Sequence, residues 1–164
     1  MKRILVIGCP GAGKSWFSRL LRDRTGIPLY YLDQIWHNPD RTHVPEEVFQ
    51  AKVSEILEKE TWIIDGNYVS SLEKRLKYCD TVFYFCFSTE ECLAGARRRI
   101  GTVREDLPWS ETELDPVFAE YIRTFHEKIT PKTEKLLENT TAQIIRFYNR
   151  EEENKYIREN LGGE

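Results

Sequence analysis

The sequence predicts an α/β domain in which helices cover both faces of a parallel β-sheet. Short apolar runs rich in β-branched and aromatic residues alternate with longer amphipathic stretches, as they do when helices connect parallel strands. The run Val82–Phe87 contains no charged residue, and an apolar pattern on both faces is typical of a central parallel strand. A chain of 164 residues can bury one good core but is short for two, so we expect a single domain over residues 1–164.

The apolar runs and amphipathic stretches place the individual elements. The expected strands are Arg3–Ile7, Leu29–Leu32, Trp62–Asp65, Thr81–Phe87 and Gln143–Tyr148. The expected helices are Lys14–Thr25, Pro45–Lys59, Ser70–Lys77, Glu90–Ile100, Asp115–Leu137 and Arg150–Asn160, with a break near Pro131 because proline interrupts a helix. Residues 101–114 are polar and follow neither pattern. A loop of this length in a compact domain is often functional, and we expect a lid there.

Composition narrows the class of protein. With 40% hydrophobic and 31% charged residues, the chain matches globular rather than disordered proteins. No apolar run approaches the length of a membrane span and the run Ile4–Ile7 is too short for a signal peptide, so we expect a cytoplasmic protein without membrane contact. The four cysteines form no CxxC pair, which favours reduced thiols and no structural metal. A net charge of -3 disfavours extended binding to nucleic acid and leaves the oligomeric state open.

One sequence motif predicts a phosphate-binding site. The segment Gly8-Cys9-Pro10-Gly11-Ala12-Gly13-Lys14-Ser15 matches the pattern GxxxxGK[ST] between an expected strand and an expected helix, which is the setting of a phosphate-binding P-loop. The N–H groups of residues 11–15 would surround an anion at the positive end of the helix dipole. Lys14 would reach the outer phosphates, and the Ser15 hydroxyl would bind Mg²⁺. We therefore expect ATP and Mg²⁺ as cofactors, held by Gly8, Gly11, Ala12, Gly13, Lys14, Ser15 and Trp16.

Two expected strands end in a carboxylate. Because parallel strands present their carboxyl ends at one edge of the sheet, Asp65 should lie beside the P-loop and hold Mg²⁺ together with Ser15. Asp33 should lie at the same edge and act on the acceptor. Each carboxylate also has a structural interpretation: Asp65 could stabilise a turn before Gly66, and Asp33 could cap a short helix that begins at Gln34.

Four arginines precede or occupy the expected lid. If Cys92, Leu93, Ala96 and Ile100 face the core, helical spacing places Arg97 and Arg99 on the flanks and Arg98 toward solvent. Arginine suits a bidentate grip on a transferring phosphoryl group, so we expect Arg97, Arg99 and Arg104 to be catalytic together with Lys14 and Asp33. The alternative is a basic helix C-terminus that complements the helix dipole.

These features, in this order along nearly the whole chain, resemble the adenylate-kinase-like group of small P-loop kinases. Tyr31-Leu32-Asp33 with Trp36, followed by Trp62-Ile63-Ile64-Asp65-Gly66-Asn67-Tyr68, resembles more narrowly the bacterial DNA topology modulation proteins. The resemblance implies a three-layer P-loop NTPase fold with a five-stranded parallel sheet in the order 2-3-1-4-5. Nucleoside monophosphate kinases carry an Asp-Gly-x-Pro-Arg element whose arginine holds the acceptor phosphate, whereas Asp65–Val69 has neither that proline nor that arginine.

The segment at about 30–60 is expected to bind the acceptor, through Asp33, Trp36 and Arg41 together with Asn67 and Tyr68. Tyr31, His37 and Arg75 are further candidates on this side, although each aromatic ring taken alone is more typical of packing than of recognition. The first hypothesis is transfer of the ATP γ-phosphoryl group to a nucleoside, a nucleotide or another hydroxylated small molecule. The second is a nucleotide-dependent regulator associated with DNA, without small-molecule kinase activity. A GTPase is a more distant third, because no Asn-Lys-x-Asp element is present.

Overall fold

The structure is a computed structural model and describes residues 1–162. It contains one sheet whose strands are β1 (Arg3–Gly8), β2 (Leu29–Tyr31), β3 (Trp62–Asp65), β4 (Thr81–Phe85) and β5 (Gln143–Phe147). The strands are parallel and lie in the order β2-β3-β1-β4-β5. The predicted fold class is therefore confirmed.

The helices are α1 (Lys14–Thr25), α2 (Leu32–Trp36), α3 (Glu46–Leu57), α4 (Val69–Tyr78), α5 (Thr89–Arg98), α6 (Pro116–Lys128), α7 (Thr130–Leu137) and α8 (Arg150–Asn160). The long predicted helix is broken at Ile129, with Pro131 in the first turn of α7, as expected. Helix α2 was not predicted as such, since Asp33 was expected to follow a strand and lies instead in the first turn of a short helix.

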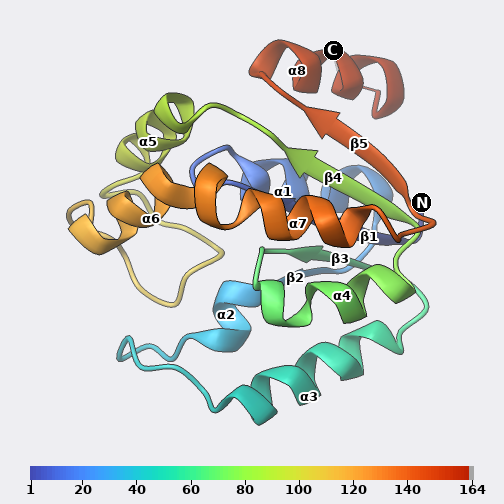
Figure 1. The fold of residues 1–164 in the computed structure, drawn as a ribbon, viewed down its shortest axis with the longest axis horizontal. Helices are drawn as coiled ribbons and strands as arrows, with labels where there is room; N and C mark the ends of the chain where they lie inside the picture. Colours follow the sequence, from blue (N-terminus) through green and yellow to red (C-terminus); the bar gives the residue numbers. More distant parts are fainter. Residues whose placement is uncertain (163–164) are drawn as a thin grey trace.

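The residues of β1 alternate between two hydrophobic cores. Ile4 and Val6 face one core, which the helices α1, α5, α6 and α8 complete. Leu5 and Ile7 face the other, which α2, α3, α4 and α7 complete. Successive side chains of a strand point to opposite faces of the sheet, so this alternation produces the three layers seen in Figure 1.

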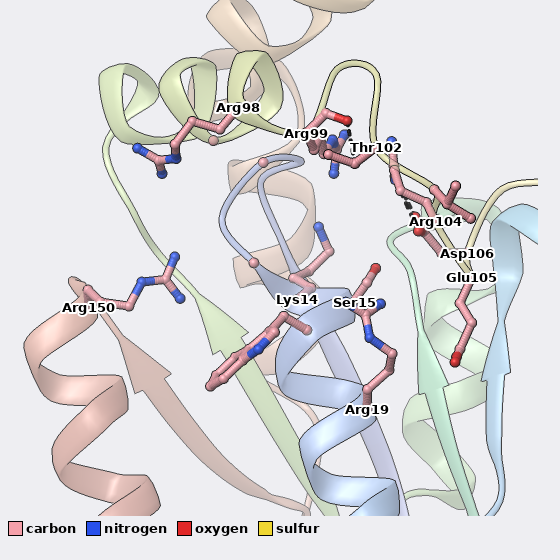
Figure 2. Close-up of a pocket in the computed structure, with 15 residues that line it drawn as sticks. Lys14, Ser15, Arg19, Arg98, Arg99, Thr102, Arg104, Glu105, Asp106 and Arg150 are labelled. Atoms are coloured by element: carbon pink, nitrogen blue, oxygen red, sulfur yellow. Dashed lines mark hydrogen bonds and ion pairs between the residues drawn. The ribbon is translucent and has the colours of Figure 1, made fainter. Parts of the chain in front are cut away.

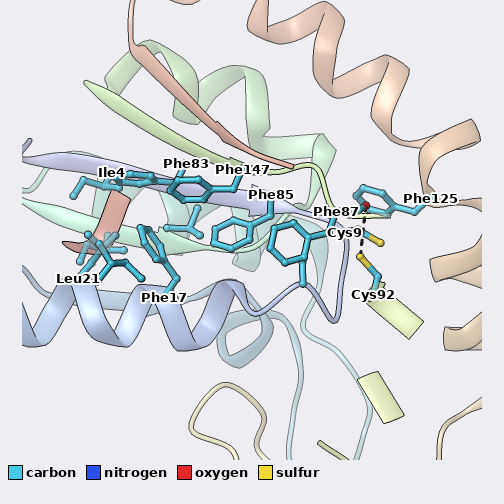
Figure 3. Close-up of a cluster of buried hydrophobic side chains, with 14 of the residues drawn as sticks. Ile4, Cys9, Phe17, Leu21, Phe83, Phe85, Phe87, Cys92, Phe125 and Phe147 are labelled. Carbon is cyan, nitrogen blue, oxygen red and sulfur yellow. Dashed lines mark hydrogen bonds between the residues drawn. The ribbon is translucent and has the colours of Figure 1, made fainter. Parts of the chain in front are cut away.

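An aromatic cluster fixes the start of α1 against the sheet. The ring of Phe17 packs edge-on against Phe83, Phe85 and Phe147 at centroid distances of 4.9, 5.5 and 5.5 Å, and Figure 3 shows these rings between α1 and the strands. Edge-to-face aromatic pairs contribute about 0.5–1.5 kcal/mol beyond their buried area. Because Phe17 follows Ser15 by two residues, this packing holds the end of the P-loop at the carboxyl end of β1.

The chain between α5 and α6 has no helix or strand and lies at the edge of the sheet where the strand arrows end, close to α2 (Figure 1). All five strands deliver their following segments to this edge, so residues distant in sequence meet there. Within residues 1–162, no helix is both long and apolar enough to cross a membrane.

Candidate active site

The P-loop turns between Gly8 of β1 and Lys14 of α1 and packs backbone to backbone against α5. Gly11 has a φ of 87°, which favours glycine. A Cβ atom at Gly11 would lie 2.0 Å from the carbonyl oxygen of Cys92, and a Cβ at Gly95 would lie 1.9 Å from the carbonyl oxygen of Gly11. Only glycine at both positions permits this approach, so the loop and α5 lie in direct backbone contact.

A cavity of about 570 Å³ opens over this loop, and we call it the P-loop cavity. Five of the predicted nucleotide-binding residues line it: Gly11, Gly13, Lys14, Ser15 and Trp16. Figure 2 shows cationic side chains around it from four segments: Arg19 of α1, Arg98 and Arg99 at the end of α5, Arg104 of the following loop and Arg150 of α8. Among the lining residues that the structure describes, only Glu105 and Asp106 are acidic, so the cavity has the charge and size to hold a polyanion such as a nucleoside triphosphate.

Other predicted phosphate-side residues support the cavity or lie outside it. Ala12 is fully buried behind the loop. The amine of Lys14 donates to the carbonyl oxygen of Cys9 at 3.2 Å, within the loop itself. Arg97 is exposed and does not line the P-loop cavity, whereas Arg98 does. Both arginines lie on α5, which ends at Arg98, two residues before the predicted end at Ile100, and Arg98 rather than Arg97 reaches the cavity.

Ser15 and Asp65 meet beside the loop. The Ser15 hydroxyl donates to Oδ2 of Asp65 at 2.6 Å, and Asp65 is only 5% exposed. Burial raises the pKa of Asp65 to about 6, although nearby Lys14 and the Ser15 hydroxyl act in the opposite direction. A hydroxyl and a carboxylate are the hard oxygen ligands that Mg²⁺ uses with substrate phosphates, so this pair fits the ion. Among the described residues no group of three or more His, Cys, Asp or Glu forms a metal cage, and a magnesium site of this kind needs none.

A second cavity, of about 410 Å³, adjoins the first, and we call it the central cavity. Lys14, Ser15 and Asp65 line it together with Asp33 and Tyr68. The Tyr68 hydroxyl donates to Oδ1 of Asp33 at 2.6 Å. Burial and the neighbouring Asp33 raise the pKa of Tyr68, so the phenol stays protonated and acts as a donor. Asp33 makes no capping hydrogen bond in α2, whose N-cap is Tyr31, and this removes the capping interpretation.

The turn between β3 and α4 contacts both the P-loop and Asp33. The side chain of Asn67 accepts from the N–H of Gly8 at 2.9 Å and donates to the carbonyl oxygen of Gly8 at 2.7 Å. Asn67 therefore fixes the entrance of the P-loop, although it also lines the central cavity. Arg75, expected on the acceptor side, is fully buried and donates to the backbone of this turn instead.

A third cavity, of about 530 Å³, continues outward from Asp33, and we call it the outer cavity. Arg41 lies over the ring of Trp109 at 5.5 Å, and His37 contacts the edge of the same ring at 5.0 Å. All three line this cavity, and burial lowers the pKa of His37. Trp36 lines neither acceptor-side cavity, because its ring stacks on His43 at 4.2 Å and packs against the core.

Arg99 and Arg104 line all three cavities. Arg104 forms ion pairs with Asp106 and, at 3.0 Å, with Glu111. Burial and the neighbouring Arg104 lower the pKa of Arg99. The buried Nε of Arg99 has no hydrogen-bond partner among the described residues, and its guanidinium lies over Phe118 at 5.7 Å. These two arginines therefore mark the point where the cavities meet.

The loop from residue 99 to residue 115 is attached at Glu105 to residues of α1, β2 and α2. Its carboxylate accepts from Arg22 at 2.9 Å and from the Tyr31 hydroxyl at 2.8 Å, while Gln34 donates to its carbonyl oxygen. Tyr31 is therefore engaged with the loop and not with the acceptor side. Whether this loop opens and closes as a lid stays a prediction.

Sequence reasoning missed several side chains of the cavities: Arg19, Arg98, Glu105, Asp106, Trp109 and Arg150. Arg150 carried a usable signal, because it directly follows the last strand and so lies at the edge where the other site segments gather. Arg19 follows Ser15 by one helical turn, which places both on one face of α1. Residues 105–109 belong to an irregular loop, whose path no periodicity predicts.

Comparisons with known proteins support this description. No protein-family model matches the sequence, and no curated protein sequence matches it significantly. Solved structures do match. Shikimate kinase from Bacteroides thetaiotaomicron has a TM-score of 0.63 and 17% identity over 96% of this chain and 95% of that chain. Shikimate kinase from Acinetobacter baumannii in complex with shikimate has a TM-score of 0.62 and 15% identity over 96% and 90%.

A gluconokinase from Sinorhizobium meliloti 1021 also matches, with a TM-score of 0.62 and 15% identity over 98% of this chain and 90% of that chain. At these identities the likeness is one of fold. The chain has the fold of these P-loop kinase structures.

Proposed function

We propose that this protein transfers the γ-phosphoryl group of ATP to a hydroxyl of a small acceptor with the help of Mg²⁺. One observation carries the proposal: Arg99 and Arg104 line three adjoining cavities, and the central one of these is lined both by the P-loop and by Asp33. Such an arrangement places a donor phosphate and an acceptor hydroxyl in one chamber, which is most of what phosphoryl transfer requires of a protein.

The P-loop side would bind and orient the nucleotide. Backbone N–H groups of residues 11–15 and the charge of Lys14 would hold the phosphates. Ser15 and Asp65 would hold Mg²⁺, which when bound neutralises charge on the β- and γ-phosphates. Arg99 and Arg104 would donate to the phosphoryl oxygens as negative charge redistributes during transfer.

The Asp33 side would bind and activate the acceptor. Tyr68 occupies Oδ1 of Asp33, which leaves Oδ2 to accept a hydrogen bond from the acceptor hydroxyl. As the acceptor oxygen forms its bond to the γ-phosphorus, the bond from that phosphorus to the bridging oxygen of ADP breaks, and the hydroxyl proton passes to Asp33. The products are then ADP and a phosphate ester of the acceptor.

The acceptor belongs to the class of hydroxylated small molecules, with Arg41 and Asn67 as further candidate contacts. The names of the structural neighbours make shikimate and gluconate the first candidates to test. The nearer resemblance to DNA topology modulation proteins remains a prediction, as does a cytoplasmic location, which the free thiols of all four cysteines favour.

The decisive experiment measures ADP release from Mg-ATP with a panel of nucleosides, nucleotides, sugar acids and polyols, and identifies the phosphorylated product by mass spectrometry. We expect at least one acceptor to stimulate ADP release severalfold in the wild type and none to do so in Lys14→Ala. If Mg-ATP binds but no acceptor is phosphorylated, and nucleotide controls binding to DNA instead, the regulator hypothesis replaces this one.

A further inference from the structure

Arg75 is a buried cation without an anionic partner. Its side chain is fully buried in α4, and no described carboxylate forms an ion pair with it. Burial lowers the pKa of Arg75 to about 9, so the group is still charged at neutral pH. Burying an unpaired charge is costly unless hydrogen bonds replace the lost water, so the contacts of this guanidinium must satisfy it.

Those contacts all belong to one turn. The guanidinium donates to the carbonyl oxygens of Gly66 at 3.1 Å, Asn67, and Tyr68 at 3.1 Å, and its Nε donates to the Ser71 hydroxyl at 3.0 Å. Three successive carbonyl groups therefore converge on a single side chain. The planar fork of arginine can serve all of them at once, whereas the ammonium of lysine cannot span them.

The turn is strained and needs such support. Tyr68 has a φ of 37°, in the left-handed region that a bulky residue rarely adopts. Strain of this kind persists only where the surroundings enforce it, and it gathers at functional sites. In this backbone conformation two adjacent side chains contact different parts of the site. Asn67 bonds to Gly8 at the P-loop, and Tyr68 bonds to Asp33 at the acceptor side.

We propose that Arg75 is a positioning residue that holds both halves of the site in register by fixing the Gly66–Tyr68 turn. Through Asn67 it sets the entrance of the P-loop, and through Tyr68 it sets the direction of the Asp33 carboxylate. The Tyr68 half of this inference rests on the proposed function, whereas the Asn67 half requires only that the P-loop binds nucleotide. The two halves can therefore be tested separately.

The first test is a double-mutant cycle on Mg-ATP affinity, measured by calorimetry without any acceptor. Asn67→Ala removes two hydrogen bonds to Gly8 and should weaken binding about tenfold, as should Arg75→Lys. If Arg75 acts through Asn67, the double variant should bind Mg-ATP less than about twofold more weakly than Arg75→Lys alone. Leu76→Ala, a buried neighbour on α4 that packs into the core, is the matched control: in its background Asn67→Ala should still cost about tenfold.

The second test is the pH profile of acceptor-stimulated turnover. Tyr68→Phe removes a hydrogen bond to the Asp33 carboxylate and should move the acidic limb to higher pH. Arg75→Lys should move it in the same direction, and the double variant should move it no further. Leu76→Ala should lower the thermal midpoint and leave the limb in place.

Additive losses of affinity in the first cycle would overturn the inference, because Arg75 would then support only the stability of α4. If Arg75→Lys does not fold, Ser71→Ala replaces it, since it removes one hydrogen-bond partner of Arg75 and keeps the charge. Failure to phosphorylate any acceptor would contradict the proposed function, while the affinity cycle would still decide whether Arg75 positions the P-loop.

Discussion

Binding of Mg-ATP should depend on the protonation of Asp65. Burial raises the pKa of this carboxyl group to about 6, and only the anion can serve as a ligand of Mg²⁺. About nine tenths of the groups are ionised at pH 7 and about one tenth at pH 5, so the affinity for Mg-ATP should fall about tenfold between them. This loss is about 1.4 kcal/mol, or about 3–6 °C of the ligand-induced rise in thermal midpoint for a domain of this size.

The nucleotide-free protein should respond to pH in the opposite direction. The pKa of Asp65 is higher in the folded state than its ordinary value of 3.8, so the folded state holds the proton more tightly. The stability from this group is therefore fully present below about pH 4 and is lost as the pH rises through about 6. Between pH 5 and pH 7, the free protein should become less stable while the stabilisation by Mg-ATP grows.

Differential scanning fluorimetry at pH 5, 6 and 7, with and without a fixed concentration of Mg-ATP, measures both effects. Asp65→Asn keeps the shape of the side chain but cannot titrate. Its rise in thermal midpoint with Mg-ATP should be smaller than that of the wild type, because an amide is a weaker ligand of Mg²⁺ than a carboxylate. That rise should vary with pH only as ATP itself is protonated. The comparison of the two proteins cancels that contribution. A wild-type shift as large at pH 5 as at pH 7, or a pH dependence shared by Asp65→Asn, would refute the reasoning.

Three further results are expected. Lys14→Ala should leave the thermal midpoint of the free protein nearly unchanged and abolish its rise with Mg-ATP, because a ligand stabilises only the state that it binds; a wild-type rise would contradict the P-loop assignment. Asp33→Asn should lower acceptor-dependent turnover by about 10²-fold or more with ATP affinity intact, and an unchanged steady-state rate would exclude Asp33 as the base. Proteolysis within residues 101–114 should slow when ATP and an acceptor are both bound, and equal rates in free and doubly bound protein would argue against a closing lid. Arg22→Ala removes an exposed ion pair with Glu105 and should speed cleavage of the free protein by about 1.5- to fivefold.

The fold was predictable because its signals are long or repeated. Five apolar runs alternate with amphipathic stretches, and each run proved to be a strand of the sheet. A short helix was expected only as an alternative beginning at Gln34, because Leu32–Trp36 is barely more than one turn and too short for helical periodicity to show. The apolar pattern also extended β4 to Phe87, whereas the strand ends at Phe85 and the chain then turns toward α5.

The candidate site was predictable where a local pattern or the topology of the sheet defines it. The P-loop is a contiguous motif, and the edge rule for parallel strands brings Asp65 to it. The contacts of Arg75 could not be predicted, because the direction of a buried side chain depends on how α4 packs after the turn. The roles of Arg97 and Arg98 could not be predicted from spacing alone, because both lie on α5 about 100° apart around its axis, and the packing of α5 against the P-loop decides which of them reaches the cavity.

The close contact between Gly95 and Gly11 has a practical consequence for anyone who engineers this protein. Rules of helix propensity would recommend Gly95→Ala, since alanine is about 1 kcal/mol more favourable than glycine inside a helix. Here the added methyl group would overlap the carbonyl oxygen of Gly11, so α5 could accept it only by moving away from the P-loop. That movement would carry Arg98 and Arg99 with it. Because the obstacle is a backbone atom that cannot turn aside, the displacement should destabilise the protein by more than the propensity gain, and designs that aim to stabilise α5 should keep glycine at this position.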